Sequence, residues 1–549
     1  MIFDRYLYAI PSILVSFVVL VYAQTLSFDY VNLDEDELIT QRQAFIKNLD
    51  NIPAVFAHDV SYPNKLSPFY RPFLTLSFMW DAVIAGGSKA FAHATNILLH
   101  IIAVLLVWRL FLALGIERMK AFFFSAVFAI HPALVQAIAW VPGRNDTLVA
   151  IFALASSLLF LASLRKKSWK TYAGHLVFFA LALLTKEIAV FLPVMLVGLW
   201  LWFSGVPFSW RRFFAYAVPW LLVIAVWYGA RAHALIGISV KSLSSMLLQI
   251  WNSVPMMLVY FGKIILPFRL SVMPSAHDSS LWYGLGALGI LGILLFLGRR
   301  NLHSQKVFFG ICWFVLFLAP SLISYDDPSR VAFYEHRLYL PMIGILFIIA
   351  LLPWEQWKIK KIGIAGICAL LVLNFMHSRA FHDQIAFWRQ AVQSSPSLAR
   401  AHNSLGMAYA NANRLDDAFQ EYQTAYQMSP DDYLINTSLG NAYRLRREPR
   451  LSEEYFKKAI AINPNRAPAH HGLGFLYATQ KRMVEAEQEW LLVIQLDSMY
   501  APSHEALAVY YAQQKRFDQS VVHIRHLMDI GAPILPELMN IFKTYGNQP

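Results

Sequence analysis

The feature that most constrains this chain is a succession of apolar runs that continues from Met1 to about Met376. An α-helix needs about 20 apolar residues to cross the hydrocarbon core of a bilayer. A helix satisfies all of its backbone polar groups within its own segment, as the hydrocarbon core requires of a single apolar run of this length. Only 15% of the 549 residues are charged, against about 25% in soluble proteins. The sequence therefore predicts an all-α, polytopic membrane protein.

Eleven runs fit a membrane span, and a twelfth is doubtful. The eleven lie near 7–26, 92–114, 120–139, 146–164, 171–185, 188–203, 213–230, 283–298, 306–323, 338–352 and 360–376. The doubtful stretch, 246–267, is interrupted by Asn252, Pro255, Lys263 and Pro267. The first run lacks a convincing small-residue cleavage site, so we expect a retained helix and not a cleaved signal peptide.

Basic loop residues test the doubtful stretch, because Lys and Arg concentrate on the cytoplasmic side of membrane proteins. If 246–267 is re-entrant or interfacial, every basic cluster falls on one side. These clusters are Arg5; Arg118 and Lys120; Arg165, Lys166, Lys167 and Lys170; Arg211 and Arg212; Arg299, Arg300 and Lys306; and Lys358, Lys360 and Lys361. The resulting topology has eleven spans, with an external first loop at 27–91 and the C-terminus outside the cytoplasm.

The composition changes near residue 377, where ordinary soluble sequence begins. We expect a membrane domain over 1–376, a linker and degenerate repeat helix over 377–398, four repeats over 399–534, and a tail over 535–549. The repeats have a period of 34 residues at two independent positions. The pairs Leu405-Gly406, Leu439-Gly440, Leu473-Gly474 and Leu507-Ala508 mark one position, and Tyr409, Tyr443, Tyr477 and Tyr511 mark the other.

This period is typical of tetratricopeptide repeats, which are helix-turn-helix pairs. The small residue allows the two helices of a pair to approach, and the aromatic residue fills the space between neighbouring pairs. Such an array is an α-solenoid with a concave binding face. We expect a protein or peptide on that face, and the alternative is that the array only stabilises or spaces an assembly.

The unusual polar motifs of the membrane half all fall on the external side of this topology. Ionisable residues at membrane depth are costly and are usually functional. The motifs contain Asp34, Glu35, Asp36 and Glu37; Arg71; His131; Arg144, Asn145 and Asp146; Lys186 and Glu187; and Glu335, His336 and Arg337. Taken singly, each motif could simply set topology or form a local ion pair. Their convergence on one face favours a polar site at the outer membrane boundary.

This set of side chains suits one kind of chemistry. A carboxylate can act as a general base, and Arg and Lys bind phosphate. Together they fit transfer from a lipid-linked phosphate donor, with the base deprotonating an acceptor hydroxyl and the cations stabilising the departing phosphate. No Walker loop, dinucleotide fingerprint or Gly-x-Ser-x-Gly elbow occurs in the sequence.

The excess of basic over acidic residues does not indicate nucleic-acid binding. The net charge is +12, but the basic residues lie in loops between apolar runs and form no stripe on a soluble domain. The two cysteines, Cys312 and Cys368, lie inside apolar runs and are expected to be packing residues.

The arrangement resembles the transmembrane and tetratricopeptide-repeat-containing O-mannosyltransferases, which have a C-type glycosyltransferase fold and are relatives of the protein O-mannosyltransferases. The segments that carry the resemblance are Val31-Asn32-Leu33-Asp34-Glu35-Asp36, Tyr70-Arg71-Pro72, His100, Ala129-Ile130-His131-Pro132, Gly143-Arg144-Asn145-Asp146, Lys186-Glu187 and Glu335-His336-Arg337-Leu338-Tyr339-Leu340-Pro341. The resemblance implies an inverting transfer of a mannose-like hexose from a polyprenyl-phosphate donor, outside the cytoplasm. Few repeats and short loops are typical of a bacterial member.

By position in the family, Asp34 is the catalytic base, and Glu35 and Asp36 are supporting groups or alternative bases. The resemblance assigns Arg337, Arg144 and Lys186 to the donor phosphate, with Glu335 and Glu187 orienting these cations. Arg71, Asp146 and His336 belong to the same substrate-binding set. His131 is either a ligand in that set or a packed intramembrane residue.

No cofactor is expected, and a divalent cation between Asp34 and Asp36 is an alternative that we do not favour. Two other functions remain open at the level of the sequence. One is a non-catalytic, membrane-anchored repeat scaffold for envelope or glycan assembly, against which the costly acidic triplet argues. The other is a ligase for lipid-linked oligosaccharides, which would rely on a large loop between late spans. A transporter is disfavoured because no inverted repeat of broken helices is evident.

Overall fold

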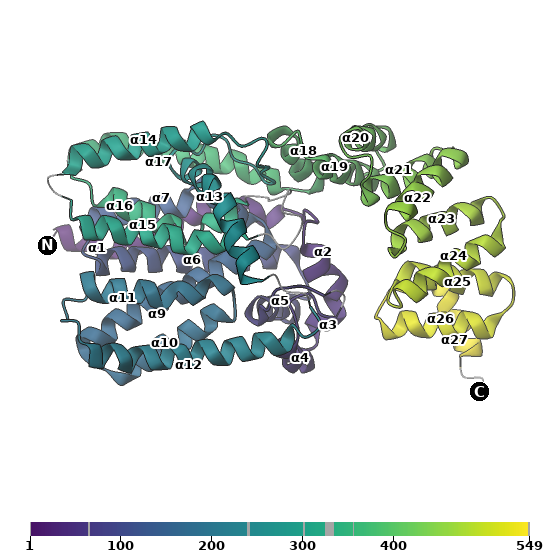
Figure 1. The fold of residues 1–549 in the computed structure, drawn as a ribbon, viewed down its shortest axis with the longest axis horizontal. Helices are drawn as coiled ribbons and strands as arrows, with labels where there is room; N and C mark the ends of the chain where they lie inside the picture. The colour runs from purple at the N-terminus through teal and green to yellow at the C-terminus, as the bar shows by residue number, and fades with distance from the viewer. Residues whose placement is uncertain are drawn as a thin grey trace. The chain divides into compact units, whose positions relative to one another are not determined.

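The computed structural model describes residues 2–63, 66–238, 242–299, 302–323, 334–354 and 356–546, and leaves out the side chains of 2–8, 243 and 356–362. Arg300 therefore lies outside the described residues, as do the side chains of Arg5, Lys358, Lys360 and Lys361. The described chain contains helices and no strands, and it forms two compact units, Met1–Ser395 and Pro396–Pro549 (Figure 1). The prediction of an all-α membrane domain followed by a repeat solenoid is confirmed.

Long apolar helices build the first unit and run side by side in Figure 1. Among the described residues, seven helices are long and apolar enough to cross a membrane, or eight if one bent pair is a single span. The seven segments are Ala9–Ser27, Lys89–Ala113, Val141–Lys166, Trp210–Ala234, Leu281–Gly298, Ser304–Leu322 and Gly363–Phe381. The helices that form these segments, wholly or in part, are α1 (Ile2–Tyr22), α6 (Lys89–Ala113), α9 (Arg144–Lys166), α12 (Trp210–Ala234), α14 (Leu281–Gly298), α15 (Ser304–Leu318) and α17 (Gln356–Ser378).

Three of the eleven expected spans form shorter helices. They are α10 (Trp169–Leu183), α11 (Leu192–Phe203) and α16 (Met342–Ala350), with 15, 12 and 9 residues. Each is below the length of about 20 residues that a straight span needs. The count of eleven therefore stays a prediction.

Proline interrupts a fourth expected span, 120–139. The helix α7 (Arg118–Ile130) ends at His131-Pro132, and the chain continues through η4 (Pro132–Leu134) into α8 (Val135–Ala139) at a bend of 53°. A proline lacks the N–H that would continue the helix. The break moves the backbone that follows it into the interior, where residues 132–141 are all buried.

The doubtful stretch 246–267 forms one helix, α13 (Leu243–Ile265), with Pro255 inside it. This helix is not among the membrane-spanning candidates in the described chain. It crosses the long helices obliquely in Figure 1 and packs against α14. Its last turn carries Lys263, which faces the interior and is 3% exposed.

The first loop is folded and not extended. It follows η1 (Ala23–Ser27) and contains α2 (Glu35–Leu38), η2 (Thr40–Arg42), α3 (Gln43–Lys47), η3 (Leu49–Asn51), α4 (Ile52–Ala57) and α5 (Pro72–Ala85). The buried Arg42 side chain donates to the Val60 carbonyl at 2.7 Å, and Asp59 accepts from the backbone N–H of Ser61 at 2.9 Å. A small apolar core holds these short helices together; it includes Tyr30, Ile46, Val55, Leu74, Phe78 and Val141.

The first unit continues beyond the last long helix through η11 (Arg379–Phe381) and α18 (Gln384–Ser394). Gln390 of α18 donates to the Leu270 carbonyl and accepts from the Val272 N–H, both at 3.0 Å. These bonds hold α18 on the loop that follows α13.

The second unit is a stack of helix pairs with an additional helix at its end. The pairs are α19 (Ala399–Asn411) with α20 (Leu415–Met428), α21 (Tyr433–Leu445) with α22 (Pro449–Ile462), α23 (Ala467–Thr479) with α24 (Met483–Leu496), and α25 (Ala501–Gln513) with α26 (Phe517–Asp529). The last helix, α27 (Pro536–Tyr545), lies in the segment expected to be a tail and packs on α26.

The 34-residue period reflects close packing within each pair. A Cβ atom added at Gly440 would lie 2.7 Å from the Phe456 ring, so only glycine allows this approach. One of the regularly spaced tyrosines has its expected role between neighbouring pairs, because Tyr443 packs edge-on against Phe419 of the preceding pair at 5.1 Å. The turn inside each pair uses a left-handed residue, at Asn413, Arg447, Lys481 and Lys515.

Candidate functional site

The acidic triplet occupies the turn that begins α2, and its three carboxylates have different environments. Asp34 is exposed, and its backbone carbonyl accepts the Leu38 N–H at 2.9 Å. Glu35 is only 1% exposed, and it accepts the Leu33 N–H at 3.0 Å. Burial raises the pKa of Glu35 to about 7. Asp36 accepts the Thr40 hydroxyl at 3.0 Å. Of the triplet, Asp34 is therefore the acid best placed to meet an acceptor from solvent, whereas Glu35 shapes the turn.

Two ion pairs form a second group of candidate residues. Arg71, at the start of α5, pairs with Glu187 at 3.2 Å, and the two side chains are 17% and 26% exposed. Lys186 pairs with Asp146 at 2.6 Å, and both of these side chains are nearly buried. The first pair joins residues 116 positions apart and the second joins residues 40 apart. Neither pairing follows from local sequence spacing.

His336 lies among the cations of these pairs. Arg71, Lys186 and Arg337 are all close enough to act electrostatically on its ring. Its Nε2 atom is 4.0 Å from Asp146, and its ring stacks on Tyr334 at 5.4 Å. Arg337 is partly exposed and donates to the Ser321 carbonyl. We name Arg71, Lys186 and Arg337 the cation cluster; its members come from three segments far apart in the sequence.

Trp140 connects the acidic turn to the cation cluster. It precedes η5 (Val141–Gly143), on which α2 packs. The Trp140 ring lies 5.3 Å from the His336 ring, with the planes tilted by 45°. The helix that follows Asp34 and the ring of His336 thus both lie against the segment from Trp140 to Gly143.

Arg144 has a different environment from the one the resemblance suggests. Its side chain is fully buried and pairs with Asp81 at 2.6 Å. It also donates to the Asn96 side chain at 2.7 Å and to the Ala92 carbonyl at 2.8 Å. These partners belong to α5 and α6, so the guanidinium ties three helices together. We assign Arg144 a structural role and leave it out of the phosphate-binding set.

Glu335 is the centre of a buried network and does not pair with Arg337. Its Oε1 atom lies 2.8 Å from Lys263 Nζ and accepts the Ser271 N–H at 2.7 Å. Its Oε2 atom lies 3.3 Å from His377 Nε2. The side-chain amide oxygen of Gln136 accepts the Glu335 N–H at 3.1 Å. Glu335 therefore positions its own segment against α8 and α13.

His131 is a packed residue in this structure. Its ring accepts the Ala133 N–H at Nδ1 (3.2 Å), which leaves Nε2 to donate to the Ile264 carbonyl at 3.0 Å. It thus joins the break after α7 to α13, and both ring nitrogens are used. Of the two roles that the sequence left open, the geometry favours packing.

Three residues of these networks were not selected from the sequence. They are Asp81, Lys263 and His377, which pair with Arg144 and Glu335. Lys263 was noticed only as an interruption of an apolar stretch. The general cost of a charge at membrane depth was the signal that could have identified it. Among the described residues, no group of three or more His, Cys, Asp or Glu side chains is arranged to hold a metal ion.

Comparisons with known proteins agree with both parts of the chain. Two family models, each described as a tetratricopeptide repeat, match residues 385–433 and 435–466. A protein O-mannosyl-transferase of Caenorhabditis elegans is 22% identical over 435 residues, which cover 75% of this chain and 61% of the worm protein. The protein O-mannosyl-transferase Tmtc1 of Drosophila melanogaster is 30% identical over 130 residues, 24% of this chain and 15% of the fly protein. The chain thus spans less than two thirds of each of these relatives.

Part of the chain is similar to solved structures, one of which is the crystal structure of MamA. The TM-score is 0.24 and the sequence identity 16%, and the match covers 30% of this chain and 94% of the MamA chain. Another is YrrB, described as a TPR protein with an unusual peptide-binding site, with a TM-score of 0.24, 20% identity and coverage of 35% and 96%. The tetratricopeptide repeats and the similarity to the O-mannosyl-transferases of worm and fly together support a relationship to the TMTC-like family.

Proposed function

We propose that the chain is an integral-membrane, inverting glycosyltransferase. It moves a mannose-like hexose from a polyprenyl-phosphate donor to an acceptor hydroxyl on the external face of the membrane. The observation that carries this proposal is the meeting of Arg71, Lys186 and Arg337 around His336, whose ring lies 5.3 Å from that of Trp140. Trp140 directly precedes η5, on which the helix that follows the exposed Asp34 packs.

The cation cluster is assigned to the phosphate of the donor. The charge on the phosphate grows as the bond to the sugar breaks, and fixed cations stabilise that charge most where water is scarce. Asp146 and Glu187 hold Lys186 and Arg71 in place through their ion pairs. A phosphate entering the cluster would share these cations with the carboxylates, so binding does not require burial of an unpaired charge.

Asp34 is assigned as the general base. An acceptor hydroxyl must lose its proton as its oxygen attacks the anomeric carbon, and a carboxylate within hydrogen-bond reach can take that proton. Asp34 is the exposed acid of its turn, whereas Glu35 is occupied by backbone N–H groups. Glu35 and Asp36 then support the turn. In this account the new bond joins the acceptor oxygen to the sugar, and the bond to the phosphate oxygen breaks.

The repeats are assigned to the acceptor or to a partner protein. Their position after the membrane unit allows a bound protein to be retained while its hydroxyl is modified, and a solenoid offers a concave face for an extended segment. We place the site and the repeats outside the cytoplasm, following the positive-inside argument. The few repeats and short loops favour a bacterial member, in which this side of the inner membrane is the periplasm.

Donor titration tests the phosphate assignment. The variant is Arg337→Ala in the full-length protein, and the control is Arg269→Ala, which removes an exposed cation of the same unit outside the cluster. Loss of one hydrogen bond to a charged group removes about 1.5–3 kcal/mol, so kcat/KM for the donor should fall by about 10- to 100-fold. The KM for the acceptor should not change, and Arg269→Ala should behave as wild type. Full activity of Arg337→Ala would refute the assignment.

A further inference from the structure

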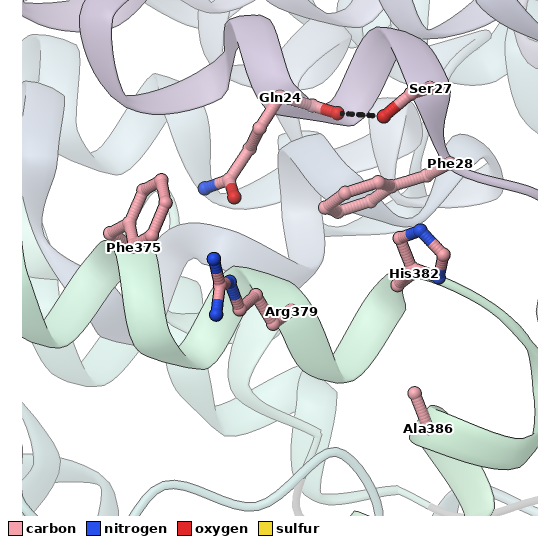
Figure 2. Close-up of a pocket in the computed structure, with 7 residues that line it drawn as sticks. All are labelled: Gln24, Ser27, Phe28, Phe375, Arg379, His382 and Ala386. Carbon is pink, nitrogen blue, oxygen red and sulfur yellow. Dashed lines mark hydrogen bonds between the residues drawn. The ribbon is translucent and has the colours of Figure 1, made fainter.

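A cavity separate from the cation cluster opens where the first and last long helices end. It has a volume of about 480 Å³ and is lined by Gln24, Ser27, Phe28, Phe375, Arg379, His382 and Ala386. In Figure 2 the Gln24 amide and the Arg379 guanidinium point toward each other across this space, with Phe375 on one side and Phe28 beside His382 on the other.

The position of the cavity corresponds to the headgroup level of a bilayer. Its lining comes from the C-terminal ends of two candidate spans, Ala9–Ser27 and Gly363–Phe381. The ends are held together, because the Asn374 side chain donates to the Tyr22 hydroxyl at 2.9 Å. A span ends at the boundary between hydrocarbon and headgroups, where aromatic and basic side chains are favoured.

Arg379 gives this cavity its chemistry. Its guanidinium lies 4.9 Å from the Phe375 ring, and no carboxylate in the described part of the chain forms an ion pair with it. The neighbouring acids are engaged elsewhere: Asp29 pairs with Lys89, and Asp383 caps α18 through the Ala386 N–H at 2.8 Å. An arginine without an acidic partner in a pocket is suited to a phosphate, which accepts two parallel N–H donors.

The surface beside the cavity is apolar. On the last turns of the same two spans, Leu20, Val372, Phe375 and Met376 are 68%, 58%, 41% and 64% exposed. Acyl chains would cover such side chains, because these helices cross the hydrocarbon region. A ligand with one phosphate and apolar tails therefore matches both the pocket and the surface beside it.

We propose that this cavity binds the phosphodiester headgroup of an anionic phospholipid of the surrounding membrane. Arg379 contacts the phosphate, the Gln24 amide donates its second N–H, and the lipid tails lie along α1 and α17. The lipid has no role in sugar transfer, since the cavity holds no carboxylate that faces it as a base. Bound lipid instead contacts both α1 and α17 and so holds the first and last spans together. This contact lies beside the buried contact of His377 with Glu335.

Native mass spectrometry of the delipidated full-length protein tests this proposal after addition of phosphatidylglycerol. Wild type should retain one tightly bound phosphatidylglycerol, and Arg379→Gln should reduce that fraction at least fivefold. The matched control is Arg211→Gln, an exposed arginine at the start of α12, which should retain the lipid. Diacylglycerol, which lacks the phosphate, should not be retained.

Four results would overturn the proposal. In the first, wild type and Arg379→Gln retain the same fraction of phosphatidylglycerol; in the second, the Arg211→Gln control loses as much lipid as Arg379→Gln. In the third, the protein retains diacylglycerol; in the fourth, an added polyprenyl phosphate displaces the bound phosphatidylglycerol. Thermal unfolding of both variants in detergent shows that each is folded before it is compared. None of these outcomes depends on sugar transfer.

Discussion

Replacing Arg144 with methionine separates a structural role from a role in donor binding. The substitution keeps much of the side-chain volume but leaves the Asp81 carboxylate, which is 7% exposed, without its partner at 2.6 Å. Removing one member of a buried ion pair costs about 3–5 kcal/mol. Thr95 still donates to Asp81 at 2.7 Å, so we expect a loss near the lower end, about 3 kcal/mol. This is roughly a hundredfold change in the folding equilibrium.

The free energy of unfolding in detergent measures this loss, and a double-mutant cycle assigns it to the pair. Arg144→Met combined with Asp81→Asn should cost at least about 2 kcal/mol less than the sum of the two single changes. The fraction of Arg144→Met that remains folded should have an unchanged KM for the donor. An unchanged stability together with a raised donor KM would refute the structural assignment and return Arg144 to the phosphate site.

Three further predictions concern pH and packing. Burial raises the pKa of Glu35 from 4.5 to about 7, so between these pH values the folded state keeps a proton that the unfolded state loses. As the pH rises through this interval, wild type should therefore lose ~3 kcal/mol of stability relative to Glu35→Gln. The Tm of the two proteins across this pH range measures the loss. The hydrogen bond with Glu489 raises the pKa of His470 above 6.5, so His470→Gln should cost more stability at pH 6 than at pH 8; an equal cost would contradict this. Gly440→Val should overpack Phe456 and cost about 1–3 kcal/mol in the unfolding of the repeats.

Local patterns were sufficient to predict much of the fold. The period of 34 identified the repeats because each pair packs mainly on its neighbours, as at Gly440 and Phe456. Hydropathy identified the long helices for a similar reason, since a span is specified by its own composition. The break at His131-Pro132 was harder to place, because an apolar run can continue through a bend that only tertiary packing makes stable.

The pairing of the polar residues could not be predicted in the same way. The resemblance implied that Glu335 and Glu187 orient the cations Arg337, Arg144 and Lys186. In the fold, Glu187 pairs with Arg71 and Glu335 pairs with Lys263. These contacts depend on how distant helices meet, and the sequence contains no local signal for that meeting.

The environment of Arg144 illustrates the same limit. In the sequence it stands in a polar turn and looks available for a ligand. In the fold, Asp81 and Asn96 arrive from two other helices and take up its guanidinium. By contrast, the exposure of Asp34 at the start of a turn agrees with the role that its place in the first loop suggested.

The most direct test of the central proposal is hexose transfer from a panel of polyprenyl-phosphate sugars by purified wild type and Asp34→Asn. Mass spectrometry of the product gives the readout, and Asp36→Asn is the matched control because Asp36 bonds to Thr40 in the same turn. We predict transfer by wild type and by Asp36→Asn, and a loss of at least about a hundredfold in Asp34→Asn with no change in Tm. Transfer by Asp34→Asn at the wild-type rate would contradict the account.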